Sequence, residues 1–198
     1  MVPRRGRLGT VCARGAGLVV LRGPSTSPLD GMETFASALG SLPMTRPGGL
    51  FIAVMGVGVA LGGAFPRGRK ALLAFGAAFA IIALIVVGPH IQVANPSRVQ
   101  VWFLFGSIAL EVVLVRGAFA HYKTAGERKL MLAILLAVGV HFVPMAGAFG
   151  PLCAALAIVC MGNAAIGLYL SRSAPLNVLW SVDGFVKILF GAMMMLLR

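Results

Sequence analysis

Six long apolar segments, separated by short polar connections, dominate the hydropathy pattern of this chain. Each has 18 to 21 residues, which as a helix matches a bilayer core about 30 Å thick. The runs do not alternate with polar residues as barrel strands would. The pattern therefore predicts an all-α fold, a polytopic membrane helix bundle with six transmembrane helices. The predicted helices cover residues 48–65, 71–91, 99–119, 130–148, 152–170 and 177–197.

Composition and charge support a membrane protein rather than a soluble one. Hydrophobic residues make up 59% of the 198 residues and charged residues 11%, whereas soluble domains average about 45–50% and about 25%. The net charge of +12 is divided among short clusters between the apolar runs. Such clusters are typical of topology determinants. We therefore expect the lipid bilayer as a partner and no nucleic acid.

Basic residues are distributed unequally between the two sides of the predicted bundle. Eight lie on one side and three on the other when the first 45 residues are left out, and eight lie on each side when they are counted. The positive-inside rule then places the connections after the first, third and fifth helices in the cytoplasm, with both termini outside. Arg outnumbers Lys 13 to 4 and Ala and Gly are abundant, which favours a GC-rich bacterial genome and the bacterial inner (plasma) membrane.

Residues 1–47 differ in composition from the rest of the chain. They are rich in Arg, Gly and Pro and show little periodicity, so we expect a disordered leader before the transmembrane domain of residues 48–198. An Arg-rich leader poor in acidic residues is also typical of an organelle transit peptide. Because the leader removes the charge bias of the other residues, the pattern favours a translation start at Met32 or Met44.

The last predicted helix, 177–197, places its polar and small residues on one face. Asp183 and Lys187 are four residues apart, so their side chains can pair. Because a charge inside the bilayer is costly, we expect this stripe to face the bundle. The stripe consists of Trp180, Asp183, Gly184, Lys187 and Gly191, and the face expected to contact lipid holds Val182, Phe185, Val186 and Leu189.

Glu111 and Arg116 are the charged residues of the predicted helix 99–119. Glu111 and Lys187 lie at a similar depth, about 15–16 Å from the outer end, and Arg116 lies at a depth from which it can reach Asp183. These four charges sum to zero. We therefore predict that helices 99–119 and 177–197 are neighbours joined by these ions.

His141 and Asn163 are expected near mid-membrane, at the level of Glu111 and Lys187. In a structural interpretation, the charges tie helices together, and His141 and Asn163 add hydrogen bonds of about 0.6–2 kcal/mol each. In a functional interpretation, Glu111 and His141 belong to a proton or substrate pathway, as titratable chains do in transporters. Both interpretations remain open at this point.

Two glycine patterns bear on helix packing. The motif Trp-x-x-x-Gly begins at Trp102 and again at Trp180, which suggests a 3+3 inverted repeat, the plan of many transporters. Gly58-x-x-x-Gly62 permits a close helix contact. That contact could lie inside the monomer or form the face of a homo-oligomer.

No catalytic or metal-binding signature is present. The chain lacks H-E-x-x-H, G-x-S-x-G and a P-loop. Cys153 and Cys160 lie about 10.5 Å apart in rise on one predicted helix, beyond the roughly 7 Å that a disulfide spans. We expect both cysteines to be small apolar packing residues. We expect no cofactor and no metal.

The segment Val138-Gly-Val-His-Phe-Val-Pro-Met145, followed by Phe149-Gly-Pro151, carries a family resemblance. It resembles the H-F-x-P segment of a family of small, functionally uncharacterised bacterial multi-spanning membrane proteins. The resemblance implies a bacterial inner-membrane protein and no particular activity. It draws attention to His141 and Pro144, because Pro144 is expected to kink helix 130–148 or to end it early.

The sequence leaves two classes of function open. The first is a small integral membrane protein with a structural or accessory role, or one that transports a small solute or protons. A protein of this first class has no enzymatic activity of its own. A transporter also requires a cavity that reaches Glu111 and His141. The alternative is a membrane-embedded enzyme or enzyme subunit that uses Glu111 and His141 for proton transfer, which requires two titratable groups within hydrogen-bond reach.

Overall fold

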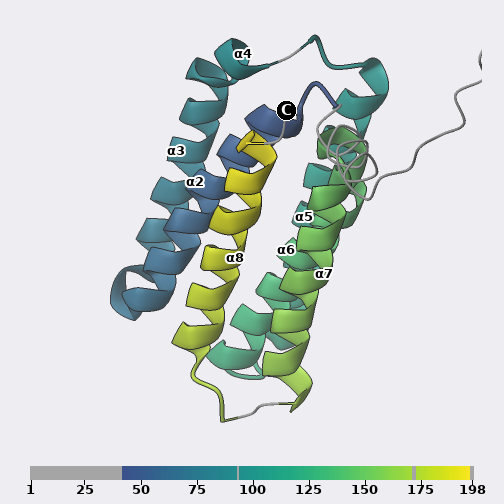
Figure 1. The fold of residues 1–198 in the computed structure, drawn as a ribbon. Coiled ribbons are helices and arrows are strands. Elements are labelled where there is room, and N and C mark those ends of the chain that lie inside the picture. Colours follow the sequence, from purple (N-terminus) through teal and green to yellow (C-terminus); the bar gives the residue numbers. More distant parts are fainter. Residues whose placement is uncertain (1–41, 93, 171–172, 197–198) are drawn as a thin grey trace, which may run out of the picture.

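Helices make up the architecture of the chain. A computed structural model describes residues 42–92, 94–170 and 173–196 (Figure 1). These ranges contain no strand, so the predicted all-α bundle is confirmed. The segments are α2 Thr45–Ala64, the 3-10 helix η1 Pro66–Gly68, α3 Arg69–Val86, α4 Gly88–Ile91, α5 Arg98–Tyr122, α6 Glu127–Phe149, α7 Pro151–Ala165, the π-helix η2 Ile166–Leu170 and α8 Leu176–Leu196.

The described part of the chain has six helices long and apolar enough to cross a membrane. Large apolar side chains cover their outer surfaces, for example Phe75 and Ile85 on α3 and Val113 on α5, each more than 60% exposed. An apolar surface of this extent marks a membrane or protein contact, and its span lengths match a bilayer core. The chain is a multi-pass membrane protein.

The N-terminal boundary of the first helix differs from the prediction. α2 begins at Thr45, so the first span starts three residues before the predicted one, within the last residues of the predicted leader. Pro47 lies in the first helical turn, where its missing N–H has no partner to lose. Met44 precedes this helix, whereas Met32 and the other leader residues up to position 41 lie outside the described residues.

The predicted helix 71–91 is divided in two. α3 ends at Val86, and Gly88–Ile91 forms the separate helix α4. Pro89 explains the break, because its nitrogen cannot donate to Ile85 and its ring clashes with the carbonyl of that residue. Hydropathy alone does not register this break, since the apolar run continues through it.

Two further local features depart from the expected helices. α6 continues past Pro144 to Phe149, so the expectation that this proline ends the helix early was wrong. α7 ends at Ala165, and the chain continues as the π-helix Ile166–Leu170. Hydropathy does not register this π-turn, because the apolar run continues through residues 166–170.

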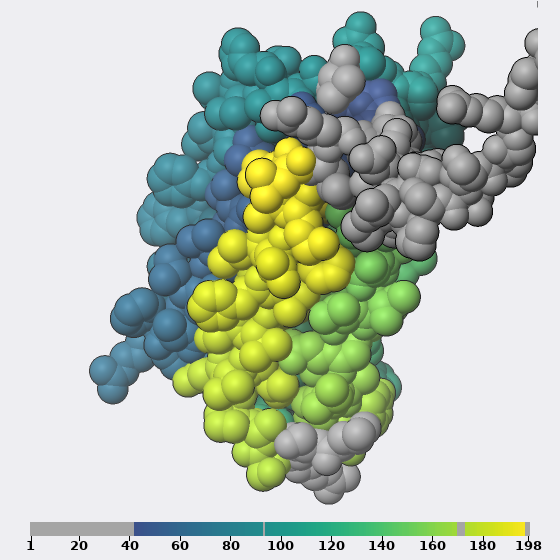
Figure 2. Space-filling model, in the orientation of Figure 1, coloured from purple at the N-terminus to yellow at the C-terminus, as the bar shows by residue number. Residues whose placement is uncertain are grey.

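α2 and α6 organise the packing of the other helices. α2 packs extensively against α8 and α3, whereas α6 packs against α5 and α7 (Figure 1). The two groups meet where α7 contacts α8, and Figure 2 shows these two helices side by side on one face of the molecule. By contrast, α3 and α5 scarcely contact each other.

The chain can be divided into two halves of three spans, first α2, α3 and α5 and then α6, α7 and α8. The helix contacts of the two halves correspond, with one exception. α8, the third span of the second half, packs on the first span α2, and α5, the third span of the first half, packs on α6. The contact between α7 and α8 has no counterpart of similar extent between α3 and α5. The Trp-x-x-x-Gly motif does not mark equivalent positions, because Trp102 is 76% exposed and Trp180 is 2% exposed.

Glycines allow the backbones of α2 and α8 to approach closely. Gly49, Gly56 and Gly63 of α2 are spaced by seven residues, as are Gly184 and Gly191 of α8. A Cβ on Gly56 would lie 2.8 Å from the Gly184 carbonyl oxygen. A Cβ on Gly191 would lie 2.5 Å from the Gly49 carbonyl oxygen. No larger residue fits at these positions without separating the helices.

Gly58, from the predicted packing motif, lies inside the monomer. A Cβ on Gly58 would approach the Cα of Gly76 in α3 to 2.7 Å, and a Cβ on Gly76 would approach the Cα of Gly58 to 2.8 Å. Gly62 lies against Arg69 at the start of α3. This pattern therefore joins α2 to α3 and does not provide an exposed face for a second copy.

Buried polar side chains bind carbonyl groups at the end of α6. The Thr45 hydroxyl donates to the Phe149 carbonyl at 3.1 Å, and the Gln100 amide nitrogen donates to the Ala148 carbonyl at 3.4 Å. The last carbonyls of a helix have no partner within it, and lipid supplies none. α2 and α5 thus each satisfy one acceptor of α6.

The glycine contact makes a prediction for alanine substitutions. In Gly184→Ala the new Cβ would lie 2.6 Å from the Ala60 Cα, against backbone that cannot rotate away. We expect a loss of about 1–3 kcal/mol in the free energy of unfolding, the usual cost of overpacking, measured as a lower Tm in detergent.

Gly106→Ala is the matched control, since nothing lies within 4 Å of its Cβ. Alanine favours a helix over glycine by about 1 kcal/mol, so this variant should keep or raise the Tm. Equal Tm values for the two variants would contradict the proposed role of the glycines.

Candidate functional site: an intramembrane cavity

A cavity of about 350 Å³ lies inside the bundle. Its walls come from α2, α3, α5, α6 and α8, and it lies where α3 and α5 scarcely contact each other. Most of the lining is apolar, including Phe51, Leu73 and Phe142. The polar side chains that line it are Glu111, His141, Trp180, Asp183 and Lys187.

The stripe predicted on the last helix does face the bundle. Asp183 and Lys187 are 1% and 2% exposed, and the Lys187 ammonium donates to Asp183 Oδ2 within the same helix. The opposite face is exposed at Val182, Phe185 and Leu189, whereas Val186 packs against the core. The Lys187 nitrogen also lies 5.7 Å from the centre of the Phe142 ring, a cation–π contact.

Glu111 and His141 meet across the contact between α5 and α6. Glu111 Oε2 lies 3.8 Å from His141 Nε2, an ion-pair distance that is too long for a direct hydrogen bond. The Glu111 side chain is 36% exposed, whereas His141 is 5% exposed as a residue. Glu111 therefore lies at the mouth of the cavity, and His141 lies in its wall.

Three buried polar atoms in the cavity wall have no hydrogen-bond partner among the described residues. They are His141 Nδ1, Trp180 Nε1 and Asp183 Oδ1. An unpaired buried polar group costs about 1–3 kcal/mol, and such groups call for an explanation. Trp180 offers a donor and Asp183 an acceptor, and both residues line the cavity, so a polar group or water bound beside them could satisfy these atoms.

Arg69 is a site residue that the sequence analysis counted only as a loop charge. It is 6% exposed, and its Nε donates to the Gly62 carbonyl at the end of α2 at 3.0 Å. Its Nη2 donates to Asn177 Oδ1 of α8 at 2.7 Å, and its guanidinium carbon lies 5.2 Å from the centre of the Trp180 ring. Arg69 thus positions the tryptophan of the cavity. Its place directly before an apolar helix was the only signal for this role.

The predicted contact between helices 99–119 and 177–197 was wrong. α5 and α8 have only sparse contacts, because α6 and α2 each take one of them as a partner. Arg116 is exposed on α5, and it forms no ion pair within the ranges that the structure describes. The expected quartet is replaced by two pairs, Asp183 with Lys187 and Glu111 with His141.

Asn163 is separate from this cavity. Its Nδ2 donates to the Leu179 carbonyl of α8 at 2.8 Å, so it joins α7 to α8. Pro144 lies one turn beyond His141 on α6 and does not line the cavity. Within the described ranges, no group of three or more His, Cys, Asp or Glu side chains could hold a metal ion.

The buried ion pair makes a prediction for substitutions that remove its charges. Lys187→Met leaves the Asp183 carboxylate buried without its cation, which costs about 3–5 kcal/mol in the free energy of unfolding. We expect a strong loss of membrane yield and Tm. Asp183→Asn combined with Lys187→Met removes both charges, so the double variant should be more stable than Lys187→Met alone. A double variant as unstable as the sum of the two single losses would contradict the pairing.

Comparison with known proteins places the chain in a family. No curated protein and no solved structure matches it. A family model matches residues 42–198, and its description is a family of unknown function (DUF6609). The expectation of an uncharacterised family is confirmed, and the chain belongs to this family of unknown function.

Proposed function

We propose that the protein is a transporter that exchanges protons for a small cation at the intramembrane cavity. The cation would carry apolar groups around its charge. The observation that supports this most directly is the convergence of Glu111, His141, Asp183 and Lys187 on one cavity with a largely apolar wall. Ligand sites are typically such hollows, with a few convergent polar groups in an apolar lining.

The structural interpretation explains these charges less well. Asp183 and Lys187 pair within a single helix, so their ion pair joins no two helices. Burying two ions costs several kcal/mol each before their attraction offsets it. Asn163, by contrast, does join two helices and needs no functional explanation.

The charge of the cavity favours a cation as the ligand. Glu111 contributes one negative charge, and Asp183 and Lys187 neutralise each other. With His141 neutral the cavity is therefore negative by one charge, and protonation of His141 makes it neutral. The lining residues from α2 and α3, such as Met55 and Ala77, are apolar, and Arg69 contacts Trp180 without lining the cavity itself. A proton and a monovalent cation would then compete.

The apolar wall favours a ligand with apolar groups around its charge. The aromatic rings of Phe51, Phe142 and Trp180 line the cavity, and ring faces attract cations. The cavity lies where α3 and α5 scarcely contact each other, with Glu111 at its mouth. We propose that the ligand enters from the lipid between these two helices.

An enzymatic role has less support. Proton transfer is possible between Glu111 and His141, but among the described residues no Ser, Thr or Cys side chain lines the cavity to act as a nucleophile. We therefore propose that the protein has no enzymatic activity of its own. The bacterial inner membrane, with both termini outside, remains the proposed location.

Proton exchange can be measured with the purified full chain in vesicles that contain a pH-sensitive dye. Addition of phenyltrimethylammonium outside should drive protons out of the vesicles, and benzenesulfonate, an anion of similar size, should not. Glu111→Gln and His141→Gln should each reduce this flux at least tenfold. His90→Gln is the matched control, because His90 is exposed on α4 and does not line the cavity.

Folded yield and Tm of each variant separate the two interpretations. Transport predicts that Glu111→Gln is folded and inactive. Equal flux in the wild type and Glu111→Gln would contradict the proposal, as would a response to benzenesulfonate equal to the response to the cation.

A further inference from the structure

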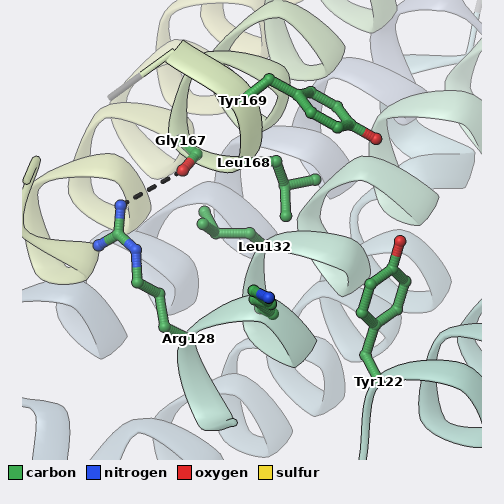
Figure 3. A pocket seen from close by; sticks show the side chains of 7 residues that line it. Tyr122, Arg128, Leu132, Gly167, Leu168 and Tyr169 are labelled. Atoms are coloured by element: carbon green, nitrogen blue, oxygen red, sulfur yellow. Dashed lines mark hydrogen bonds between the residues drawn. The ribbon is translucent and has the colours of Figure 1, made fainter. Parts of the chain in front are cut away.

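A second hollow lies at the end of the bundle where α5 ends and α6 begins. It has a volume of about 430 Å³, and it is formed by the last residue of α5, the first turns of α6 and the π-helix η2. Its lining residues are Tyr122, Arg128, Lys129, Leu132, Gly167, Leu168 and Tyr169 (Figure 3). This end of the bundle also holds the basic connection between α5 and α6.

Arg128 fixes the shape of this hollow. Its Nη1 donates to the Ala174 carbonyl at 2.5 Å, and its Nη2 donates to the Gly167 carbonyl at 3.3 Å. Figure 3 shows the second of these bonds along one side of the hollow. The guanidinium thus satisfies one carbonyl within η2 and one in the connection before α8, and it keeps a positive charge beside the hollow.

Lys129, Tyr122 and Tyr169 supply the other polar groups. Lys129 is exposed, and its ammonium forms no ion pair within the described part of the chain. Figure 3 shows the hydroxyl groups of Tyr122 and Tyr169 turned toward the same gap. An ammonium and two hydroxyl donors at one hollow are suited to an anion with several oxygen atoms.

An apolar groove continues from this hollow into the membrane. It has a volume of about 450 Å³, and it shares Tyr122 and Leu168 with the hollow. Along α5 it extends from Val113 to Tyr122, a rise of about 13 Å. Its lining includes small residues, among them Gly117 and Ala137, and is apolar apart from His121 and the Tyr122 hydroxyl.

We propose that the hollow and the groove together bind an anionic phospholipid. The phosphate would lie at Lys129 and the two tyrosine hydroxyls, and an acyl chain would lie in the groove between α5 and α6. Basic pockets between transmembrane helices bind anionic headgroups, and the adjoining groove suits a ligand that also carries a chain. This site lies on a different face of α6 from the face with His141.

Lipid retention by the purified full chain tests the headgroup contact. Native mass spectrometry and Tm shifts would compare phosphatidylglycerol with phosphatidylcholine of the same acyl chains. Phosphatidylglycerol should bind more tightly, and Lys129→Gln should weaken it about fivefold, the effect of one basic residue near a membrane surface. Lys123→Gln is the matched control, because Lys123 is exposed at the same end of the bundle and does not line the hollow.

A substitution in the groove tests the chain contact. Nothing lies within 4 Å of a Cβ on Gly117, so Gly117→Phe fills the groove without straining the fold, and it should weaken binding of both lipids. Gly106→Phe, equally unobstructed on α5 and outside the groove, should leave binding unchanged.

Two results would overturn the proposal. The first is equal retention of the two lipids by the wild type, or equal effects of Lys129→Gln and Lys123→Gln. The second is a Tm shift with glycerol phosphate, which has no acyl chain, as large as that with phosphatidylglycerol. That result would assign the hollow to a free phosphate compound.

Discussion

The backbone contact between α2 and α8 is the constraint on which the rest of the bundle depends. Glycines at intervals of seven residues on α2 meet Gly184 and Gly191, so the first and last spans approach without side chains between them. A Cβ on Gly56 would lie 2.9 Å from the Cβ of Lys187. The same contact therefore holds the base of the lysine in place, and its ammonium remains inside the cavity. Lipid offers no hydrophobic force between helices, so such close packing provides much of the association energy.

The cavity arises from an incomplete symmetry of helix pairing. α7 and α8 close one face of the bundle, whereas α3 and α5, the equivalent spans in a 3+3 arrangement, scarcely contact each other. Both polar pairs line the cavity beside this opening: Asp183 and Lys187 pair within α8, and Glu111 faces His141 across the contact between α5 and α6. Trp180 Nε1 and Asp183 Oδ1, from the same wall, have no hydrogen-bond partner among the described residues, and under the proposed function they would bind the ligand. Groups positioned before binding lower the cost of binding a ligand.

Helix ends account for most of the buried polar residues that lie outside the cavity, whereas Ser107 donates to the Leu104 carbonyl within α5. Arg69 binds a carbonyl at the end of α2, Arg128 binds carbonyls near the end of η2, and Thr45 and Gln100 bind carbonyls at the end of α6. Because lipid provides no donor, each helix end needs a side chain from a neighbour. Arg128 thereby also shapes the hollow that we assign to a phospholipid.

The sequence by itself determined the number of spans and the inward face of α8. Span length and hydropathy depend on the bilayer, and the spacing of Trp180, Asp183 and Lys187 depends on helix geometry alone. Only the tertiary structure decided which helices are neighbours. Their equal depth predicted that Glu111 lies beside Lys187, yet depth does not specify the position of a helix around the bundle. In the structure α8 packs on α2, through the glycine contacts. The sequence likewise could not predict the role of Arg69. Its partners Gly62, Asn177 and Trp180 come together only in the folded chain.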